Sequence, residues 1–455
     1  MPPRQRQRGV GHEVRRAIHV DAMIAAREER IAHFGKPAIQ REMTRQGDGE
    51  LGFVAIRAAH YTGFMTGKQR ILAAFHGERP DTVPFCPNLY YWFYNRLAAG
   101  TLPPALEGAQ HPFDALRVLG ADILARWDTE HATREVYTAG EFSEEYSGES
   151  PCDRPLVTAF NRYPPHTSHR RRRFATPHGT LTQTWTLTEQ AGADFESEHW
   201  WKDWSEYPAI RFLLEAREYA FDADEFHRWV GRVGDDGVMM AHITESPLKA
   251  LHWLAGPENA SLFLADHPEE MQALARIHED KALRLLESMV DNPDAQVLMA
   301  LDNLDSAFYP PRFYRDFCHS FFTRAAEIIH RRNKIFVVHA CGRNRALMPL
   351  VGASRVDCLE GLTPPPMGNV PLAEARRMTG YDRFTVNGGM YAPHLEITED
   401  AESRLHEYVR GLFASMPEQR HFIFASSCTT PLPTPWENLV YFRDAAREYG
   451  RVRRA

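Results

Sequence analysis

The sequence lacks three features that would indicate a location outside the cytoplasm or binding to a negatively charged partner. No uninterrupted apolar run of about 18 residues occurs, so no segment is long enough to cross a bilayer as a helix. Residues 1–7 carry arginines but no apolar stretch of the signal-peptide type follows them. An excess of positive charge is missing as well, because the formal net charge is −7. We therefore expect a cytoplasmic protein that binds neither nucleic acid nor membrane.

Cysteine is also scarce and has no regular spacing. Only six cysteines occur among 455 residues, at positions 86, 152, 318, 341, 358 and 428. In a reducing compartment such scattered cysteines are thiols, metal ligands or core residues rather than disulfides. With 43% hydrophobic and 25% charged residues, the chain has the composition of a globular protein, and its length suits one large barrel or two smaller domains.

Strand and helix patterns alternate regularly in the second half of the chain. Apolar segments rich in β-branched residues predict strands at 238–242, 297–301, 335–341, 356–359, 384–386 and 421–425. The helices predicted around them cover 222–233, 247–290, 310–332, 343–352, 371–379, 399–415 and 435–449. Two earlier strands, 83–89 and 121–127, bring the number to eight. Eight parallel strands with helical crossovers predict an α/β fold of the (β/α)8, or TIM, barrel type.

Two parts of the chain do not follow this alternation. Residues 1–64 predict a weakly packed N-terminal extension, so the barrel domain is expected to span 65–455. Residues 129–210 predict a polar loop and a hairpin, inserted where they could fold over an active-site mouth. The four arginines at 170–173 are expected on a solvated loop or strand edge rather than at an anion site. The aromatic residues 90–94 suit either a pocket wall or a helix packed on the barrel.

Side chains capable of chemistry follow several of the predicted strands. They are His242, Asp302, Asp305, His339, Cys341, Glu360 and Cys428. Catalytic residues of a TIM barrel lie at the carboxyl ends of its strands, so these side chains are expected to meet at one end. His339 and Cys341 are two residues apart, which puts both on the same face of a strand. With Cys428 they form a three-ligand set typical of catalytic zinc, although a lone histidine or buried cysteine is more often a core residue than a ligand.

The other candidates each allow more than one role. Glu360 could be a weak fourth ligand, a carboxylate that fixes the tautomer of His339, or a surface acid. Asp302 and Asp305 could act as general acid or base groups or accept hydrogen bonds from substrate, or they could only stabilise loops. His242 is a further catalytic candidate. Gly388 and Gly389 are expected to keep one side of the site open, so that a substrate or cofactor can approach the metal closely.

Several of these segments together resemble a known family. The segments are 67–75 with 78–84, 176–181, His339-Ala340-Cys341-Gly342, Asn387-Gly388-Gly389 and 434–438. Over about 67–450 the chain looks like the uroporphyrinogen decarboxylase superfamily. Its His-x-Cys pair and late cysteine are similar to the zinc motif of the corrinoid-dependent methyltransferases, such as methylcobamide:coenzyme M methyltransferase. The resemblance implies that His339, Cys341 and Cys428 bind Zn²⁺. The arginine-rich motif of true decarboxylases is not matched, because 88–96 contains one arginine.

The resemblance leads to three functional hypotheses. The first is a zinc-dependent methyltransferase that moves a methyl group between a corrinoid protein and a thiol or a methylated small molecule, in the demethylating direction or its reverse. Two thiolates and an imidazole would leave zinc little residual charge, which keeps a bound sulfur nucleophilic. The chain has no Asp-x-His-x-x-Gly pattern, so the corrinoid (cobalamin) is expected on a separate partner protein. The alternatives are a cofactor-free decarboxylase and a catalytically silent barrel that binds a corrinoid protein. Assembly into a homo-oligomer is left open.

Overall fold

The structure is a computed structural model that describes residues 65–126, 132–150, 156–158, 161–188, 193–416 and 419–451. The chain divides into two units, Met1–Phe64 and Met65–Ala455, and all described residues lie in the second. The predicted N-terminal extension and Trp127 are therefore outside the described residues. No helix within these ranges is long and apolar enough to cross a membrane.

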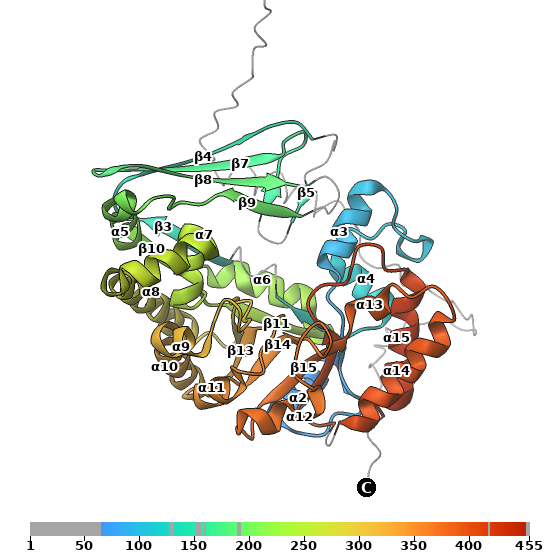
Figure 1. The fold of residues 1–455 in the computed structure, drawn as a ribbon. Coiled ribbons are helices and arrows are strands. Elements are labelled where there is room, and N and C mark those ends of the chain that lie inside the picture. The colour runs from blue at the N-terminus through green and yellow to red at the C-terminus, as the bar shows by residue number, and fades with distance from the viewer. Residues whose placement is uncertain are drawn as a thin grey trace, which may run out of the picture. The chain divides into compact units, whose positions relative to one another are not determined.

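Eight parallel strands form the central sheet and confirm the barrel (Figure 1). In chain order they are β1 (Phe85–Cys86), β2 (Ile123–Ala125), β11 (Gly237–His242), β12 (Val297–Ala300), β13 (Ile335–His339), β14 (Cys358–Leu362), β15 (Thr385–Met390) and β16 (Phe422–Ser426). Their order in the sheet is β1-β16-β15-β14-β13-β12-β11-β2. β1 is much shorter than its predicted range because Pro84 and Pro87 lack the N–H that a strand ladder needs.

Helices follow the strands and cover the outside of the barrel. The longer ones are α2 (Gly67–His76), α3 (Tyr90–Ala99), α4 (Pro112–Leu119), α6 (Ala223–Val233), α7 (Pro247–Asp266), α8 (Pro268–Met289), α10 (His319–His330), α12 (Leu372–Thr379), α14 (Ala401–Ser415) and α15 (Trp436–Tyr449). The shorter α11 (Met348–Ala353) occupies the end of the predicted helix 343–352. The aromatic residues 90–94 lie in α3, where Tyr90, Trp92 and Phe93 are buried and Trp92 stacks on Trp436. They therefore pack α3 onto the barrel, which is the predicted helix-packing role rather than that of a pocket wall.

The helix α2 closes the amino-terminal end of the barrel. Its buried residues Ile71, Ala74 and Phe75 belong to the same apolar cluster as the inward-facing strand residues. Strand alternation sends Val337 into this interior cluster and its neighbours Phe336 and Val338 into the outer layer under the helices. The barrel interior is thus a packed core, and its chemistry is confined to the opposite end.

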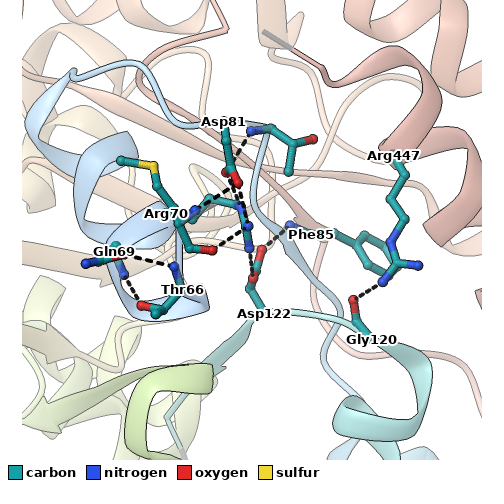
Figure 2. A network of polar contacts seen from close by, with 10 residues as sticks. Thr66, Gln69, Arg70, Asp81, Phe85, Gly120, Asp122 and Arg447 are labelled. Atoms are coloured by element: carbon teal, nitrogen blue, oxygen red, sulfur yellow. Dashed lines mark hydrogen bonds and ion pairs between the residues drawn. The ribbon is translucent and has the colours of Figure 1, made fainter. Parts of the chain in front are cut away.

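A polar network joins the first and last strands of the sheet order (Figure 2). The Asp122 N–H donates to the Phe85 carbonyl oxygen at 2.9 Å, and the Phe85 N–H donates to the Asp122 carboxylate at 3.2 Å. Arg70 of α2 lies between Asp122, at 2.5 Å, and Asp81, at 2.7 Å. Burial raises the pKa of Asp122 to about 6, although Arg70 opposes this shift. These contacts close the gap between β1 and β2 at the end of the barrel where α2 lies.

The insertion after β2 is larger than the predicted loop and hairpin. An antiparallel sheet has the order β4-β7-β8-β9, formed by β4 (Glu141–Ser147), β7 (His169–Thr176), β8 (Gly179–Leu187) and β9 (Asp194–Glu198). The other insertion elements are β3 (Thr133–Tyr137), paired with β10 (Arg217–Phe221), β5 (Leu156–Val157), paired with β6 (Arg162–Tyr163), and α5 (Tyr207–Ala216). Figure 1 shows the four-stranded sheet as a separate layer above α7.

The four arginines at 170–173 lie on β7, an inner strand of this sheet, so the prediction of a loop or strand edge is wrong. Arg170 pairs with Glu144 at 2.6 Å, and Arg172 pairs with Glu135 at 2.9 Å. Two of the four guanidinium groups are therefore neutralised within the insertion, and the Arg170–Glu144 pair links the neighbouring strands β7 and β4.

Candidate metal centre

Three metal-competent side chains meet where β13 and β16 end. The ligand atoms of His339, Cys341 and Cys428 all lie within 4.8 Å of one another. His339 is the last residue of β13, Cys341 lies in the loop beyond it, and Cys428 follows the end of β16. The predicted strand therefore ends two residues early, and a loop rather than strand alternation brings Cys341 to the site. Strands β14 and β15 lie between β13 and β16, as the sequence predicts.

The separation of these ligand atoms is slightly larger than that in a zinc-bound site. Zinc–sulfur bonds of about 2.3 Å and tetrahedral geometry place ligand atoms roughly 4 Å apart. The observed limit of 4.8 Å therefore requires the side chains to move together by only about 1 Å to bind the metal. One imidazole and two thiols are a donor set that suits Zn²⁺ and leaves its fourth position open.

Glu360 fixes the orientation of the His339 ring. The His339 Nδ1 lies 2.5 Å from the Glu360 carboxylate. Burial alone would raise the pKa of Glu360, but Arg126 and His339 together hold that pKa below its ordinary value, so the group is a carboxylate that only accepts hydrogen bonds. The imidazole proton is then on Nδ1, and Nε2 remains as the metal donor. Glu360 is only 5% exposed, so the surface-acid alternative is wrong and its position is that of a tautomer-fixing carboxylate.

Arg126 is a site residue that the sequence did not reveal. It follows β2, is 3% exposed, and forms an ion pair with Glu360. Its Nη1 also lies 3.1 Å from the His339 Nδ1, and its Nη2 donates to the Cys428 carbonyl at 3.5 Å. A buried guanidinium therefore balances the carboxylate that holds the ligand histidine.

The side chains of Cys341 and Cys428 are hydrogen-bonded to each other. A hydrogen bond from Cys341 holds the pKa of the Cys428 thiol well below its ordinary value, and contact with His339 adds to this shift against the effect of burial. The same hydrogen bond, followed by burial, raises the pKa of Cys341. Cys428 is therefore the more readily ionised of the two thiols. A bound dication is the group whose charge would make both sulfurs thiolates.

Backbone contacts link the loops that carry the ligands. The Thr363 hydroxyl lies 3.2 Å from the Cys341 carbonyl and 3.1 Å from the Ser427 carbonyl, and it can donate to either. The Asn88 side-chain amide donates to the Cys428 carbonyl at 3.0 Å. Gly361, with φ +86°, packs so close to His339 that an added Cβ would lie 3.0 Å from the ring. Nothing in the sequence distinguished this glycine from the others.

A pocket of about 480 Å³ borders the cluster through Cys341 and Gly342. Its walls come from β8 and β9 of the inserted sheet, from α7 and from the loops after β12 and β13. The lining residues are Trp185, Asp194, Phe195, Glu196, His199, Lys249, His252, Trp253, Pro257, Asn303, Asp305, Phe308, Tyr309, Cys341 and Gly342. This volume suits a small molecule. The insertion does border the expected site, because its strands form one wall of the pocket.

The remaining acid and base candidates occupy different positions. Asp305 lines the pocket, and its carboxylate accepts from the N–H groups of Ala307 and Arg343 at 2.8 and 3.1 Å. Asp302 is fully buried and accepts from the Ser246 N–H, which places it behind the pocket wall. Burial raises the pKa of Asp302 to about 6, against the effect of its bonds with Ser246. His242 ends β11, and burial lowers its pKa to about 3, so its imidazole is neutral.

Gly388 and Gly389 do not open the site, which corrects the sequence-based expectation. Both are buried residues within β15. A Cβ on Gly388 would lie 2.2 Å from the Leu362 carbonyl oxygen of the neighbouring strand. A Cβ on Gly389 would lie 2.9 Å from Leu412 of α14. The two glycines therefore allow close packing of a strand and a helix, and neither faces the pocket.

Comparisons with known proteins agree with the fold. Residues 223–449 match the family model described as uroporphyrinogen decarboxylase (URO-D). A methyltransferase from Methanosarcina mazei has a similar structure, with a TM-score of 0.54 and 15% identity over 85% of this chain and 99% of that chain. A B12-independent methionine synthase from Shewanella sp. W3-18-1, in complex with selenomethionine, matches at a TM-score of 0.37 and 11% identity over 81% of this chain and 95% of that chain. No curated protein matches the sequence. At 15% identity the structure from Methanosarcina mazei establishes only a shared fold.

Proposed function

Residues 223–449 belong to the uroporphyrinogen decarboxylase family, and from this premise we propose that the protein is a zinc-dependent methyltransferase. It would move a methyl group between a corrinoid held by a separate protein and a thiol or methylated small molecule. The observation that carries the proposal is the convergence of His339, Cys341 and Cys428 within 4.8 Å beside a pocket. The structural similarity to a methyltransferase from Methanosarcina mazei is consistent with it.

The residues around the cluster have separate tasks in this proposal. Zinc held by two thiolates and an imidazole would bind a substrate sulfur as a thiolate and keep it electron-rich. Glu360 holds the proton on His339 Nδ1, and Arg126 neutralises Glu360. Cys341 is the ligand that lines the pocket, so the open coordination position is expected on that side. Asp305 ties the loop that carries Cys341 to the loop after β12.

A cofactor-free decarboxylase is the second candidate, because decarboxylation gives the family its name. Such an enzyme needs several cations directed at substrate carboxylates. Among the residues that line the pocket, Lys249 is the only lysine or arginine. Arg126 is already paired with Glu360. The described pocket therefore favours the metal-based reaction.

Metal analysis separates these two functions. We expect one zinc per chain in protein purified without chelator, and little zinc in the variants Cys341→Ser and Cys428→Ser. Cys86→Ala is a matched control, because this buried cysteine belongs to the barrel interior and not to the cluster. Methyl transfer is then measured with methylcobalamin and a panel of thiols, through the change in corrinoid absorbance. Absence of zinc from the parent protein would contradict the proposal, and so would a zinc-loaded protein inactive in both directions with a corrinoid protein present.

A further inference from the structure

The pocket contains one lysine, Lys249, whose ammonium group pairs with no acidic residue in the described part of the chain. Lys249 lies in the first turn of α7 and is largely enclosed by the pocket walls. Its Nζ lies 4.3 Å from the centre of the Trp253 ring. Within the described residues, no carboxylate lies within 4.0 Å of this ammonium group. Its cationic end is therefore available to a ligand in the pocket.

The carboxylates that line the same pocket are all engaged by the protein. Glu196 pairs with His199 at 3.0 Å. Asp194 accepts from the Tyr163 hydroxyl at 3.0 Å and also from an asparagine amide. Asp305 accepts from two backbone N–H groups. Each of these carboxylates thus has a partner within the protein, whereas Lys249, the only lysine or arginine of the lining, pairs with no carboxylate of the described residues.

The rest of the pocket wall is aromatic. The Trp185 and Trp253 rings lie 5.7 Å apart at an interplanar angle of 43°. Phe195 and Phe308 also line the pocket, and they are 50% and 52% exposed, which is unusual for large apolar side chains. Flat apolar surfaces next to a cation suit a planar ligand with one anionic end.

We infer that the pocket binds an aryl carboxylate, with its carboxylate on Lys249 and its ring against the aromatic wall. This inference rests on the proposed function for one point only, namely that such a molecule is the methyl donor or acceptor and lies at the open metal position on the side of Cys341. Burial lowers the pKa of Lys249, against the effect of Asp302 and other nearby acids, so the lysine gains from an anionic partner. The volume of about 480 Å³ accommodates a single substituted ring.

Binding is measured with three probes of similar shape and different charge on the full-length protein. Isothermal titration compares benzoate, its neutral analogue benzamide and the cation benzyltrimethylammonium. We expect benzoate to bind at least about tenfold more tightly than benzamide, as a charge-assisted hydrogen bond in a buried site allows. Lys249→Met should remove this preference, and Lys249→Arg should retain it. Lys202→Met is the matched control, because Lys202 pairs with Glu198 and does not line the pocket.

Three results would overturn the inference: no binding of benzoate to the parent protein, unchanged benzoate affinity in Lys249→Met, or tighter binding of the cation than of benzoate. If Lys249→Met does not fold, titration of benzoate and benzamide into the parent protein and into Lys249→Arg still tests whether the pocket prefers the anion. The titrations are repeated in Cys428→Ser, which lacks a metal ligand but keeps the pocket lining. Benzoate binding that persists in Cys428→Ser would show that the anion site does not depend on the metal site. Failure of methyl transfer would then contradict only the proposed function, and failure of benzoate binding would contradict only this inference.

Discussion

Replacing Glu360 by glutamine should weaken both the fold and the metal site. Glutamine keeps an oxygen that can accept from His339 Nδ1, but it removes the negative charge that faces Arg126. The side chains of Arg126 and Glu360 are only 3% and 7% exposed. Loss of one partner from such a buried pair costs about 3–5 kcal/mol, because the remaining charge is left uncompensated. Loss of the carboxylate behind a ligand histidine lowers metal affinity about 10–100-fold.

The two effects are measured separately. Urea unfolding of the metal-free protein, followed by tryptophan fluorescence, gives the change in unfolding free energy. Competition with a chromophoric chelator gives the zinc affinity. The double variant Arg126→Met with Glu360→Gln removes both charges, so we expect it to be more stable than the sum of the single changes by about 1–3 kcal/mol. Glu374→Gln is the control, since the exposed Glu374 and Arg377 pair should contribute less than about 1 kcal/mol.

A Glu360→Gln protein with an unchanged urea midpoint and zinc affinity within about twofold of the parent would refute this account of the site. Additive effects in the double variant would refute the part assigned to Arg126. In that case the guanidinium would be compensated by other groups, and its contact with Glu360 would be incidental.

Three further predictions concern the extension, two glycines and one histidine. A chain that starts at Met65 should stay soluble and keep its melting temperature, because 1–64 has little of the apolar periodicity that a core needs; insoluble protein would contradict this. Gly361→Ala should lower zinc affinity measured by chelator competition, whereas Gly389→Ala should lower only stability, by about 1–3 kcal/mol, because its Cβ would meet a helix side chain. Equal zinc losses in both would be inconsistent with this difference. The pKa of His242 is lowered to about 3 in the folded protein. As pH falls, this histidine is therefore protonated in the unfolded chain before it is protonated in the folded protein, and stability decreases from about pH 6.5 toward pH 3. His242→Gln should reduce that fall by up to about 1.4 kcal/mol per pH unit in urea unfolding of metal-free protein, and identical slopes would count against it.

The sequence predicts the barrel and the ligand set because both follow local patterns. Each strand is a short apolar run, and the carboxyl ends of parallel strands meet at one end of a barrel, so His339 and Cys428 could be brought together without coordinates. The family resemblance is confirmed for residues 223–449 by the matching family model.

The missed features depend on partners that lie far away in the chain. Arg126 lies within the predicted strand 121–127, and its partner Glu360 lies 234 residues later, so nothing nearby marks it as a site residue. In the inserted sheet, β4 and β7 are rich in charged residues that pair across the strands, as for Arg170 and Glu144, so the apolar pattern of these two strands is weak. In the sequence, Gly388 and Gly389 are equally compatible with an open approach to the metal site and with close packing against a neighbouring strand. Only the position of Leu362 shows that close approach applies.

The helix that closes the barrel from below also determines when the barrel can be completed during synthesis. The Thr385 hydroxyl lies 3.4 Å from the carbonyl of Ala74 in α2, a contact between residues 311 positions apart. At translation rates of about 5–20 residues per second, roughly 15–60 s pass before that strand is made. Until then, some of the strand residues that cover the apolar side chains of Ile71 and Phe75 have not been synthesised. Chains that stop before β16 should therefore expose these side chains and depend on chaperones, whereas the finished chain can bury them.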